Sequence, residues 1–380
     1  MIIKTKFQIQ QDVFDLTIDS NLDIFRVDSK PRPYTVEFIN DNKFTWINSL
    51  MQDQKHPLIL IDKNVKNICL NTVNFGNINV YEVDAVEDNK NINKVLHICN
   101  WLLEQNANRG SHLFVIGGGI LQDLGAFSSY MFKRGIPWTF IPTTLLAQAD
   151  SCLGGKTAVN HGNSKNVLGL FSAPRRVFID INFLESLRLS DYLSGAGEIF
   201  RLLATAGDNC IELLENSIDS FLVKDKTTIK NLISSSLQVK KAIVENDEFE
   251  LDIRRSMNYG HSLGHALEAL SNYYIPHGQA VSLGMIIENQ LSTDRHLLSE
   301  HLNKRINILG KRLISDYIQM FIKNLPLENL MTFLTNDKKA EGNTLKIATL
   351  TASNLMEFIS LNLDDNGLSE ILSSIKKAVA

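Results

Sequence analysis

The residues best suited to chemistry lie in one stretch, Met257–Met285, which holds three of the nine histidines of the chain. His261 and His265 are four residues apart, so a helix here places both imidazoles on one face. Pro276 interrupts the helical pattern, and His277 follows it directly. Glycines flank each histidine and permit the close backbone approach of a crowded site. Because imidazole nitrogens are common zinc ligands, the set predicts a metal site, although a single histidine is more typical of an ordinary core or surface residue.

A glycine run near the middle of the first half suits anion binding. Gly117–Gly119 follow a buried apolar stretch and precede a helical pattern, which is the geometry for a diphosphate at a helix N-terminus. The strict dinucleotide fingerprint requires a third glycine where this chain has Gln122. A tight strand-to-helix turn therefore explains the glycines equally well.

A second glycine-containing segment carries basic and amide side chains. Gly154, Gly155 and Lys156 partly match a P-loop, but that motif needs glycine where this chain has Asp150. Backbone amides, two lysines and two asparagines in such a run favour phosphate binding. The alternative is a solvated basic loop.

Two pairs of charged residues have both a functional and an ordinary interpretation. Glu198 and Arg201 are three residues apart on an apolar helical segment, which suits a metal ligand with a neighbour or a surface ion pair. Lys240 and Arg254 suit a bound carboxylate or phosphate, or solvent-exposed charges. Spacing alone favours the surface interpretation of both pairs.

Two differently built halves must position these residues. Apolar strands at 34–38, 57–62, 79–83 and 112–116 surround a helix at 91–105, which predicts an α/β domain with a mainly parallel sheet over residues 1–185. Apolar and polar residues alternate in its N-terminal extension, which predicts a hairpin or an edge strand. Helical periodicity dominates residues 186–380, which predicts a mostly α-helical domain with a short hairpin within 345–359.

Composition excludes several classes of protein. The 380 residues carry a net charge of −4, so the balance gives no sign of binding to nucleic acid or to an anionic membrane. No apolar run reaches the roughly 18 residues of a membrane span, and no signal-peptide core is present at the N-terminus. The four cysteines are scattered, which fits a reducing compartment. We therefore expect a cytoplasmic protein without structural disulfides.

Taken together, the motifs resemble the dehydroquinate synthase superfamily, the sugar phosphate cyclases, and the pattern is closest to 3-dehydroquinate synthase. The resemblance is carried by GGGILQDLGAF (117–127), the run at 134–150, GGKTAVN (154–160), KN (165–166), GEIFR (197–201), NYGHSLGHALEA (258–269) and HGQAV (277–281). Order and spacing agree as well as residue types.

The resemblance implies a Rossmann-like, NAD-binding α/β domain and a helical domain that holds a divalent metal, Zn²⁺ or Co²⁺. By matching motif position, the implied metal ligands are Glu198, His261 and His277. The implied NAD contacts are Asp62, Glu87, Lys90, Gly118, Gly119, Asp123, Thr143, Thr144 and Lys165. The implied catalytic and substrate-site residues are Asp150, Lys156, Asn166, Arg201, Lys240, Arg254, Asn258, His265 and a late lysine, Lys339. Arg134 resembles the arginine that reaches the neighbouring subunit's phosphate site, which implies a homodimer.

The implied activity is that of a lyase that eliminates phosphate from a sugar phosphate and closes a carbocycle. The nearest branch acts on 3-deoxy-arabino-heptulosonate 7-phosphate in the shikimate pathway of aromatic amino acid biosynthesis. Two departures leave other readings open, because Arg201 stands where the family has lysine and Gln279 where it has glutamate. These departures motivate the first alternative, a related cyclase of secondary metabolism or surface polysaccharide synthesis. The second alternative comes from a structurally related class, the NAD- and metal-dependent polyol dehydrogenases.

Overall fold

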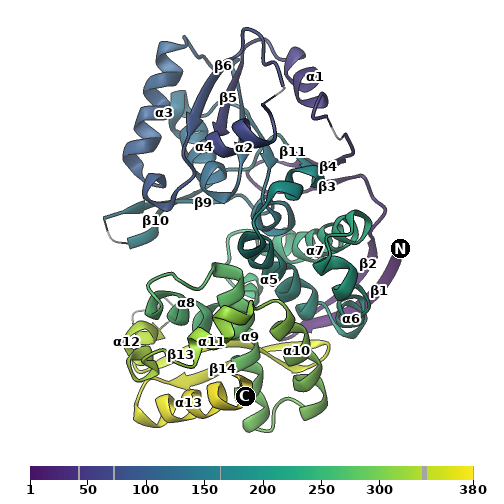
Figure 1. Ribbon diagram of the computed structural model, residues 1–380, viewed down its shortest axis with the longest axis vertical. Helices are drawn as coiled ribbons and strands as arrows, with labels where there is room; N and C mark the ends of the chain where they lie inside the picture. Colours follow the sequence, from purple (N-terminus) through teal and green to yellow (C-terminus); the bar gives the residue numbers. More distant parts are fainter. Residues whose placement is uncertain (42, 72, 163, 336–339, 380) are drawn as a thin grey trace. The chain divides into compact units, whose positions relative to one another are not determined.

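The computed structural model describes residues 1–380 apart from 42, 72, 163, 336–339 and 380 (Figure 1). The chain forms two compact units, one of residues 22–188 and the other of residues 1–21 together with 189–380. The sequence predicted a boundary between residues 185 and 186, with the whole N-terminal extension in the first domain. The first 21 residues instead belong to the second unit. Lys339, the expected late lysine, lies outside the described residues.

The first unit is built on a seven-stranded sheet with the order β3-β4-β11-β8-β7-β5-β6. The edge strand β3 pairs antiparallel with β4, and the other neighbouring strands run parallel. The expected mainly parallel α/β fold is therefore confirmed. The strands are β3 (Ile24–Val27), β4 (Tyr34–Ile39), β5 (Pro57–Asp62), β6 (Asn79–Val83), β7 (His112–Gly117), β8 (Trp138–Pro142) and β11 (Arg176–Asp180).

Helices cover both faces of this sheet (Figure 1). Ile59 and Ile116 share a core with Ile47 and Met51 of helix α1. Val115 points to the opposite face, because neighbouring residues of a strand alternate, and meets α4 there. The helices of this unit are α1 (Trp46–Gln52), α2 (Lys63–Ile68), α3 (Ile92–Glu104) and α4 (Gly119–Met131).

The segment expected as a glycine-rich loop forms a β-hairpin. Gly154 and Gly155 adopt φ values of 103° and 64°, which favour glycine, and strand β9 (Lys156–His161) follows them. It pairs antiparallel with β10 (Ser164–Phe171). The basic residues of this motif therefore lie on an extended ribbon and not on a loop.

The second unit is mostly helical, as expected for the C-terminal half. Its helices are α5 (Leu189–Thr205), α6 (Asp208–Leu222), α7 (Lys226–Asn246), α8 (His261–Leu270), α9 (His277–Asp294), α10 (Glu300–Arg312), α11 (Asp316–Ile322), α12 (Leu330–Thr335) and α13 (Asp365–Val379). A 3₁₀ helix, η5 (Ile253–Asn258), leads into α8. The buried helix α9 packs against α5, α8, α10 and α13. Throughout the described part of the chain, helices fall short of the length and apolar character needed to cross a membrane.

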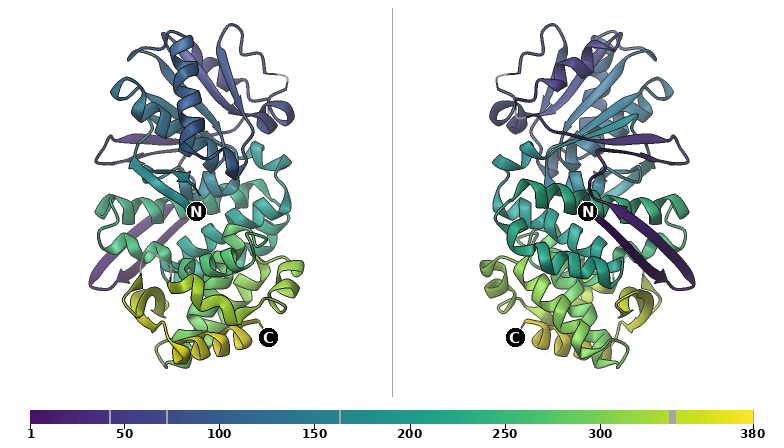
Figure 2. Two further views of the ribbon diagram at one scale, coloured as in Figure 1. Left: turned by 90° about the vertical axis from the view of Figure 1, so that its left-hand side faces the viewer. Right: turned by 90° about the vertical axis from the view of Figure 1, so that its right-hand side faces the viewer.

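A five-stranded sheet with the order β12-β13-β14-β1-β2 completes the helical unit. The N-terminal extension forms the hairpin of β1 (Ile2–Ile9) and β2 (Asp12–Asp19), and β1 pairs parallel with β14 (Leu355–Asn362). The expected hairpin near the C-terminus is β13 (Thr344–Ala352) with β14. Figure 2 shows the N-terminal hairpin beside the helices α6 and α7, which it contacts.

Candidate active site

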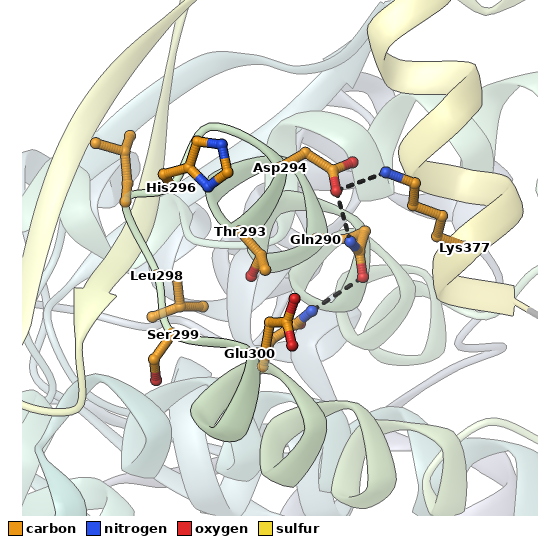
Figure 3. A pocket seen from close by; sticks show the side chains of 10 residues that line it. Gln290, Thr293, Asp294, His296, Leu298, Ser299, Glu300 and Lys377 are labelled. Atoms are coloured by element: carbon orange, nitrogen blue, oxygen red, sulfur yellow. Dashed lines mark hydrogen bonds and ion pairs between the residues drawn. The ribbon is translucent and has the colours of Figure 1, made fainter.

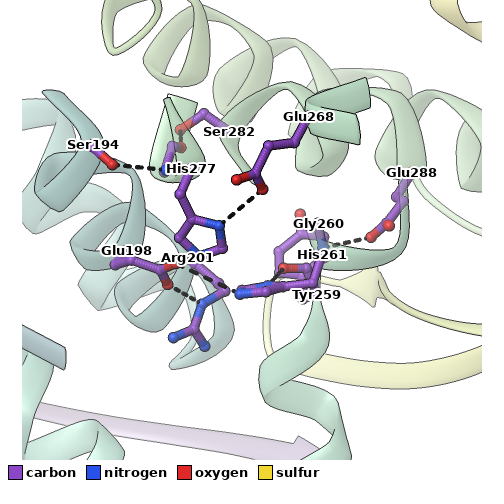
Figure 4. A network of polar contacts seen from close by, with 11 residues as sticks. Ser194, Glu198, Arg201, Tyr259, Gly260, His261, Glu268, His277, Ser282 and Glu288 are labelled. Carbon is purple, nitrogen blue, oxygen red and sulfur yellow. Dashed lines mark hydrogen bonds and ion pairs between the residues drawn. The ribbon is translucent and has the colours of Figure 1, made fainter. Parts of the chain in front are cut away.

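Three ionisable side chains converge where α5, α8 and α9 meet (Figure 4). Glu198 Oε1 lies 3.1 Å from His277 Nε2 and 3.5 Å from His261 Nε2. Glu198 comes from the middle of α5, whereas His261 and His277 are the first residues of α8 and α9. The structure thus brings together the three residues that motif position suggested as metal ligands.

Glycines allow the three helices to approach closely enough for this convergence. A Cβ atom on Gly278 would overlap the carbonyl oxygen of Ser194 in α5, and one on Gly197 would overlap the carbonyl oxygen of Gly278. Between α9 and α8, a Cβ on Gly284 would overlap the carbonyl oxygen of Gly260. The Gly278 amide also donates to Ser194 Oγ at 2.9 Å. Backbone packing therefore fixes the side chains of this site.

Charges around Glu198 set the protonation of the cluster. Burial opposes its negative charge, but Arg201, His261 and His277 together hold the pKa of Glu198 well below its usual value. Burial, with Arg201 nearby, holds the pKa of His261 well below 6.5. Burial also disfavours a charged His277, yet its bonds to Glu198 and Glu268 raise its pKa to about 10. These neighbours therefore favour the ionised form of the Glu198 carboxylate at the centre of the cluster.

The other nitrogen of each histidine is held by an oxygen atom. His261 Nδ1 lies 3.2 Å from the carbonyl oxygen of Tyr259, and His277 Nδ1 lies 3.3 Å from Glu268 Oε2. Such contacts orient an imidazole so that Nε2 is presented to a metal. Sequence reasoning missed Glu268, although it follows His261 by seven residues and therefore lies on the same face of the helix.

His265 is the third member of the histidine group. Ligand nitrogens of His261, His265 and His277 lie within 4.8 Å of one another. His265 is exposed, and its ring centroid lies 5.1 Å from that of His261 and 5.4 Å from that of His277. Its position therefore suits either a further metal ligand or a proton-transferring group beside the metal.

Arg201 is directed at the carboxylate and not at the protein surface. Its Nε donates to Glu198 Oε2 at 2.6 Å, and the side chains of Arg201 and Glu198 are 3% and 2% exposed. The spacing correctly indicated an i,i+3 ion pair, but the expected exposure was wrong. Because Oε2 is engaged by Arg201, Oε1 is the oxygen that faces both histidines.

Lys240 and Arg254 are also buried, with 5% and 3% exposure, so the surface interpretation was wrong for them too. Arg254 lies in η5, where its backbone amide donates to Asp247 Oδ2 and its side chain donates to the carbonyl oxygen of Glu248. In the same 3₁₀ helix, Asn258 donates to a carboxylate of the preceding loop, Glu250, at 3.0 Å. Sequence reasoning missed this carboxylate, which no spacing pattern marked.

Gln279 belongs to the scaffold of the helical unit. It is fully buried, and its Oε1 accepts hydrogen bonds from the backbone amide and the hydroxyl of Ser315, each at 2.9 Å. Ser315 precedes helix α11. Glutamine in place of glutamate at this position therefore affects the hydrogen bonds at the start of α11, even though Gln279 is only two residues from His277.

In the first unit, the glycine run forms the turn from β7 into α4. Gly118 precedes α4 without a side-chain cap, so the first amides of the helix remain available to an anion. A Cβ on Gly118 would come within 2.9 Å of Thr144, whereas one on Gly119 would meet nothing closer than 4.0 Å. The glycine that packs helix on strand is Gly125, whose added Cβ would overlap Val115. The dinucleotide fingerprint has its third glycine at the position of Gln122. In this chain Gly125, three residues later, provides the close packing of helix on strand instead.

A polar network next to this turn connects several of the expected cofactor and substrate residues. Lys90 Nζ lies 2.6 Å from Asp123 Oδ2 and donates to Asn166 Oδ1 at 2.7 Å. Asn160 donates to Glu87 Oε1 at 2.8 Å, and its own Oδ1 accepts from the Asn166 amide at 2.9 Å. Desolvation raises the pKa of Asp123 although Lys90 opposes that shift. The network therefore ties the β9–β10 hairpin to the N-terminal half of the unit.

Three more of the expected cofactor residues lie at the carboxyl ends of the parallel strands. Thr143 and Thr144 follow β8, and the Thr143 hydroxyl is buried without a hydrogen-bond partner in this structure. Asp62 ends β5 and caps α2 by accepting from the Asn64 amide at 2.9 Å. Burial raises the pKa of Asp62. In open α/β sheets this edge is where ligands bind.

The last expected site residues of this unit are more exposed. Lys156 is the exposed first residue of β9, and Lys165 lies half-buried on β10. Asp150 is half-buried in a π-helical turn at Ala147–Ser151. Arg134, the residue expected to reach a neighbouring subunit, is exposed at the end of a short 3₁₀ helix.

These features define a class of enzyme with a nucleotide-binding type of α/β unit and a helical unit that gathers nitrogen and carboxylate ligands. Family models described as 3-dehydroquinate synthase N-terminal and 3-dehydroquinate synthase C-terminal match residues 80–194 and 195–340. The chain therefore belongs to the 3-dehydroquinate synthase family, as the resemblance predicted.

Individual relatives agree with this family. The chain is 36% identical over 274 residues to a 3-dehydroquinate synthase of Dictyoglomus turgidum, covering 71% of this chain and 75% of that protein. It is 35% identical over 339 residues to a 3-dehydroquinate synthase of Pelagibacter ubique, covering 85% and 90%. Its fold is similar to that of 2-deoxy-scyllo-inosose synthase complexed with carbaglucose-6-phosphate, NAD⁺ and Co²⁺, with a TM-score of 0.80, 20% identity and coverage of 93% and 99%.

Proposed function

We propose that this chain is an NAD- and divalent-metal-dependent lyase of the 3-dehydroquinate synthase type. Its substrate would be 3-deoxy-arabino-heptulosonate 7-phosphate, from which it eliminates phosphate before the carbocycle closes. The observation that carries the proposal is the convergence of Glu198, His261 and His277 in a member of this family. The two buried cations, Lys240 and Arg254, support a substrate that carries both a carboxylate and a phosphate.

The donor set fits a divalent metal such as Zn²⁺ or Co²⁺. A tetrahedral zinc with ligands at about 2.0–2.1 Å separates neighbouring ligand atoms by about 3.3 Å. The distances from Glu198 Oε1 to the two imidazole nitrogens, 3.1 and 3.5 Å, bracket that value. Two histidines and one carboxylate leave a coordination position for substrate, and His265 lies beside it.

The α/β unit fits NAD. The uncapped start of α4, the small residue Gly119 and the unpartnered Thr143 hydroxyl suit a diphosphate and its hydrogen bonds. The proposed contacts are Asp62, Glu87, Lys90, Gly118, Gly119, Asp123, Thr143, Thr144 and Lys165. Bound NAD⁺ would supply reversible hydride transfer at a substrate alcohol, and a divalent metal held by Glu198, His261 and His277 would supply Lewis-acid polarisation of the oxygen of that alcohol.

The protein's own groups then have separable roles. Glu268 and the Tyr259 carbonyl orient the two histidines, and Arg201 holds the oxygen of Glu198 that faces away from them. Buried Lys240 and Arg254 bind the anionic groups of the substrate, because guanidinium and ammonium donors are strong partners of carboxylate and phosphate. Asp150, Lys156, Asn166 and Asn258 complete the proposed substrate site, and His265 moves a proton. We place Arg201 among the positioning residues, which revises its expected role as a substrate contact.

The proposal includes a homodimer in which exposed Arg134 reaches the partner's phosphate site. It also includes a cytoplasmic location, which the four free cysteines support. We propose that the helical domain binds metal and substrate and that the α/β domain binds NAD.

Phosphate release from a panel of substrates tests the proposal. The protein is incubated with NAD⁺ and Zn²⁺ or Co²⁺ and with the seven-carbon acid phosphate, sedoheptulose 7-phosphate or glucose 6-phosphate. We expect stoichiometric phosphate release from the acid phosphate without net NADH. Release from a neutral sugar phosphate alone would instead support a specialised cyclase, the alternative that Arg201 motivates. Net NADH formation from glycerol without phosphate release would support a polyol dehydrogenase.

A further inference from the structure

A pocket of about 490 Å³ lies at the amino ends of β7, β8 and β11 in the α/β unit. Its charged lining residues are Arg32, Arg109, Arg134 and Arg175. Trp138 and Phe171 supply apolar walls. The glycine turn and the two threonines lie at the carboxyl ends of the same parallel strands, so this pocket is at the opposite edge of the sheet from the proposed NAD site.

The positive charge in this pocket has no nearby counter-charge. Among the residues that the structure describes, no aspartate or glutamate lines it. Within the described ranges, no carboxylate lies at ion-pairing distance from any of its four arginines. Arg32 is half-buried, and burial together with the neighbouring Arg175 lowers its pKa. Guanidinium groups gathered in a concave site without acids are typical of phosphate and carboxylate recognition.

The backbone restricts two of these arginines before any ligand binds. Arg32 stands between Pro31 and Pro33, whose rings fix their φ angles. Arg134 has a φ of 64°, in the left-handed region that non-glycine residues rarely adopt. Constrained backbone of this kind is common at ligand sites. A residue that is already ordered loses less conformational entropy when the ligand binds.

A larger pocket in the helical unit shows the opposite arrangement (Figure 3). It measures about 970 Å³ and lies beside the end of α9 and the start of α10. Its Asp294 is paired with Lys377 at 2.7 Å and accepts from Gln290 at 2.9 Å. Asp294 and Lys377 therefore neutralise each other in this pocket, whereas the arginines of the first pocket leave their charge available to a ligand.

We propose that the four-arginine pocket binds a multiply charged oxyanion, a phosphate compound or a polycarboxylate, at a site separate from the NAD edge. Each guanidinium group can bind such a ligand in bidentate fashion, because its N–H donors match the spacing of two oxygens. Arg134 is shared with the proposed active site, whereas Arg32, Arg109 and Arg175 lie outside it, so these three arginines define a site apart from the proposed reaction.

Calorimetric titration of the full-length protein with pyrophosphate and with citrate tests this site. The two probes separate a phosphate from a carboxylate preference. The test variant is Arg32→Ser/Arg175→Ser, which avoids Arg134 because that residue is assigned to the substrate phosphate. The control is Arg26→Ser/Arg176→Ser, which removes the same charge from arginines of the same unit that do not line the pocket and are paired with Asp28 and Glu37 at 2.7 Å. Phosphate release by every variant is measured in parallel.

We expect at least one probe to bind the wild type in one equivalent per chain and to bind the test variant about tenfold more weakly or worse. The control variant should keep the wild-type affinity, and the test variant should keep the wild-type KM and kcat. Equal weakening in test and control variants would overturn the proposal by showing a general charge effect. A raised KM in the test variant would also overturn it, because the arginines would then serve the substrate phosphate. The proposal would also be overturned if neither pyrophosphate nor citrate bound the wild type.

Discussion

The chemistry-bearing residues of the helical unit and those of the α/β unit are held in different ways. Glu198, His261 and His277 are fixed by helices whose backbones touch through glycines. Lys90, Asp123 and their neighbours are fixed by one another, through side-chain hydrogen bonds to a partly exposed hairpin. The first arrangement is determined by packing and is complete before a ligand binds, whereas side-chain bonds can be exchanged for bonds to a ligand.

This difference separates two kinds of functional residue. Substitutions in the helical cluster should change metal affinity or the fold itself, because the site and the core are the same structure there. Substitutions on the hairpin should change substrate binding and leave the fold intact, because exposed residues contribute little to stability. The following variants test that distinction.

Gly278→Ala should have the largest effect, because its new methyl group would occupy the position of the Ser194 carbonyl oxygen. Helices α5 and α9 would have to separate, and we expect the free energy of unfolding to fall by about 3 kcal/mol or more. Chemical denaturation measures this loss. Gly119→Ala is the matched control, since its methyl group would meet only Ser151 Oγ at 4.0 Å. Equal stability of the two variants would contradict glycine-mediated packing as the basis of the site.

His261→Ala should abolish binding of Zn²⁺ or Co²⁺ and phosphate release while the fold persists, because one of three ligands is lost. Metal content after dialysis and circular dichroism measure the two properties. His301→Ala, on the exposed start of α10, is the control and should keep one equivalent of metal. A full equivalent of metal in the His261 variant would remove this histidine from the ligand set.

Arg201→Met should weaken metal binding about 10- to 100-fold, because Glu198 would lose the partner that holds its second oxygen. Competition for Co²⁺ with a coloured chelator measures the affinity. Arg201→Lys keeps the charge and should recover part of the loss. If Arg201 instead contacts substrate, the methionine variant would bind metal as tightly as the wild type and show a raised KM.

Elements with a strong local pattern were predictable from the sequence. The helix expected at 91–105 is Ile92–Glu104, capped by Asn91, and the four expected apolar strands are all present. Helical spacing also placed His261 and His265 on one helix. These features depend on apolar periodicity and caps, which neighbouring residues alone determine.

Features that depend on distant partners were not predictable. The N-terminal hairpin pairs with β14, more than three hundred residues later in the chain, so its neighbours in sequence could not reveal which unit holds it. Burial of Lys240 and Arg254 results from tertiary packing, and so does the role of Gly125 against Val115. Lone charged residues look solvent-exposed in a sequence because most of them are.

Lys156→Ala should raise KM about tenfold and lower kcat, because a charge-assisted contact to the substrate phosphate is lost. Metal affinity and thermal stability should not change, since Lys156 is exposed on the hairpin. Lys55→Ala, an exposed lysine outside the proposed site, serves as the control. Unchanged kinetics of the Lys156 variant would mean that the hairpin does not bind phosphate.

Gln279→Glu should have the smallest effect, although it restores the family's usual residue two positions from His277. The Gln279 side chain is bonded to Ser315, and a carboxylate accepts the same two hydrogen bonds. A negative charge at the start of α11 is also favoured by the helix dipole, which offsets part of the cost of burying it. We therefore expect KM, kcat and the choice among the sugar phosphates to stay within about twofold of the wild type. A switch of substrate in this variant would show that the region after His277 contributes to substrate selection. Gln279 would then belong to the substrate site as well as to the scaffold that its hydrogen bonds to Ser315 indicate.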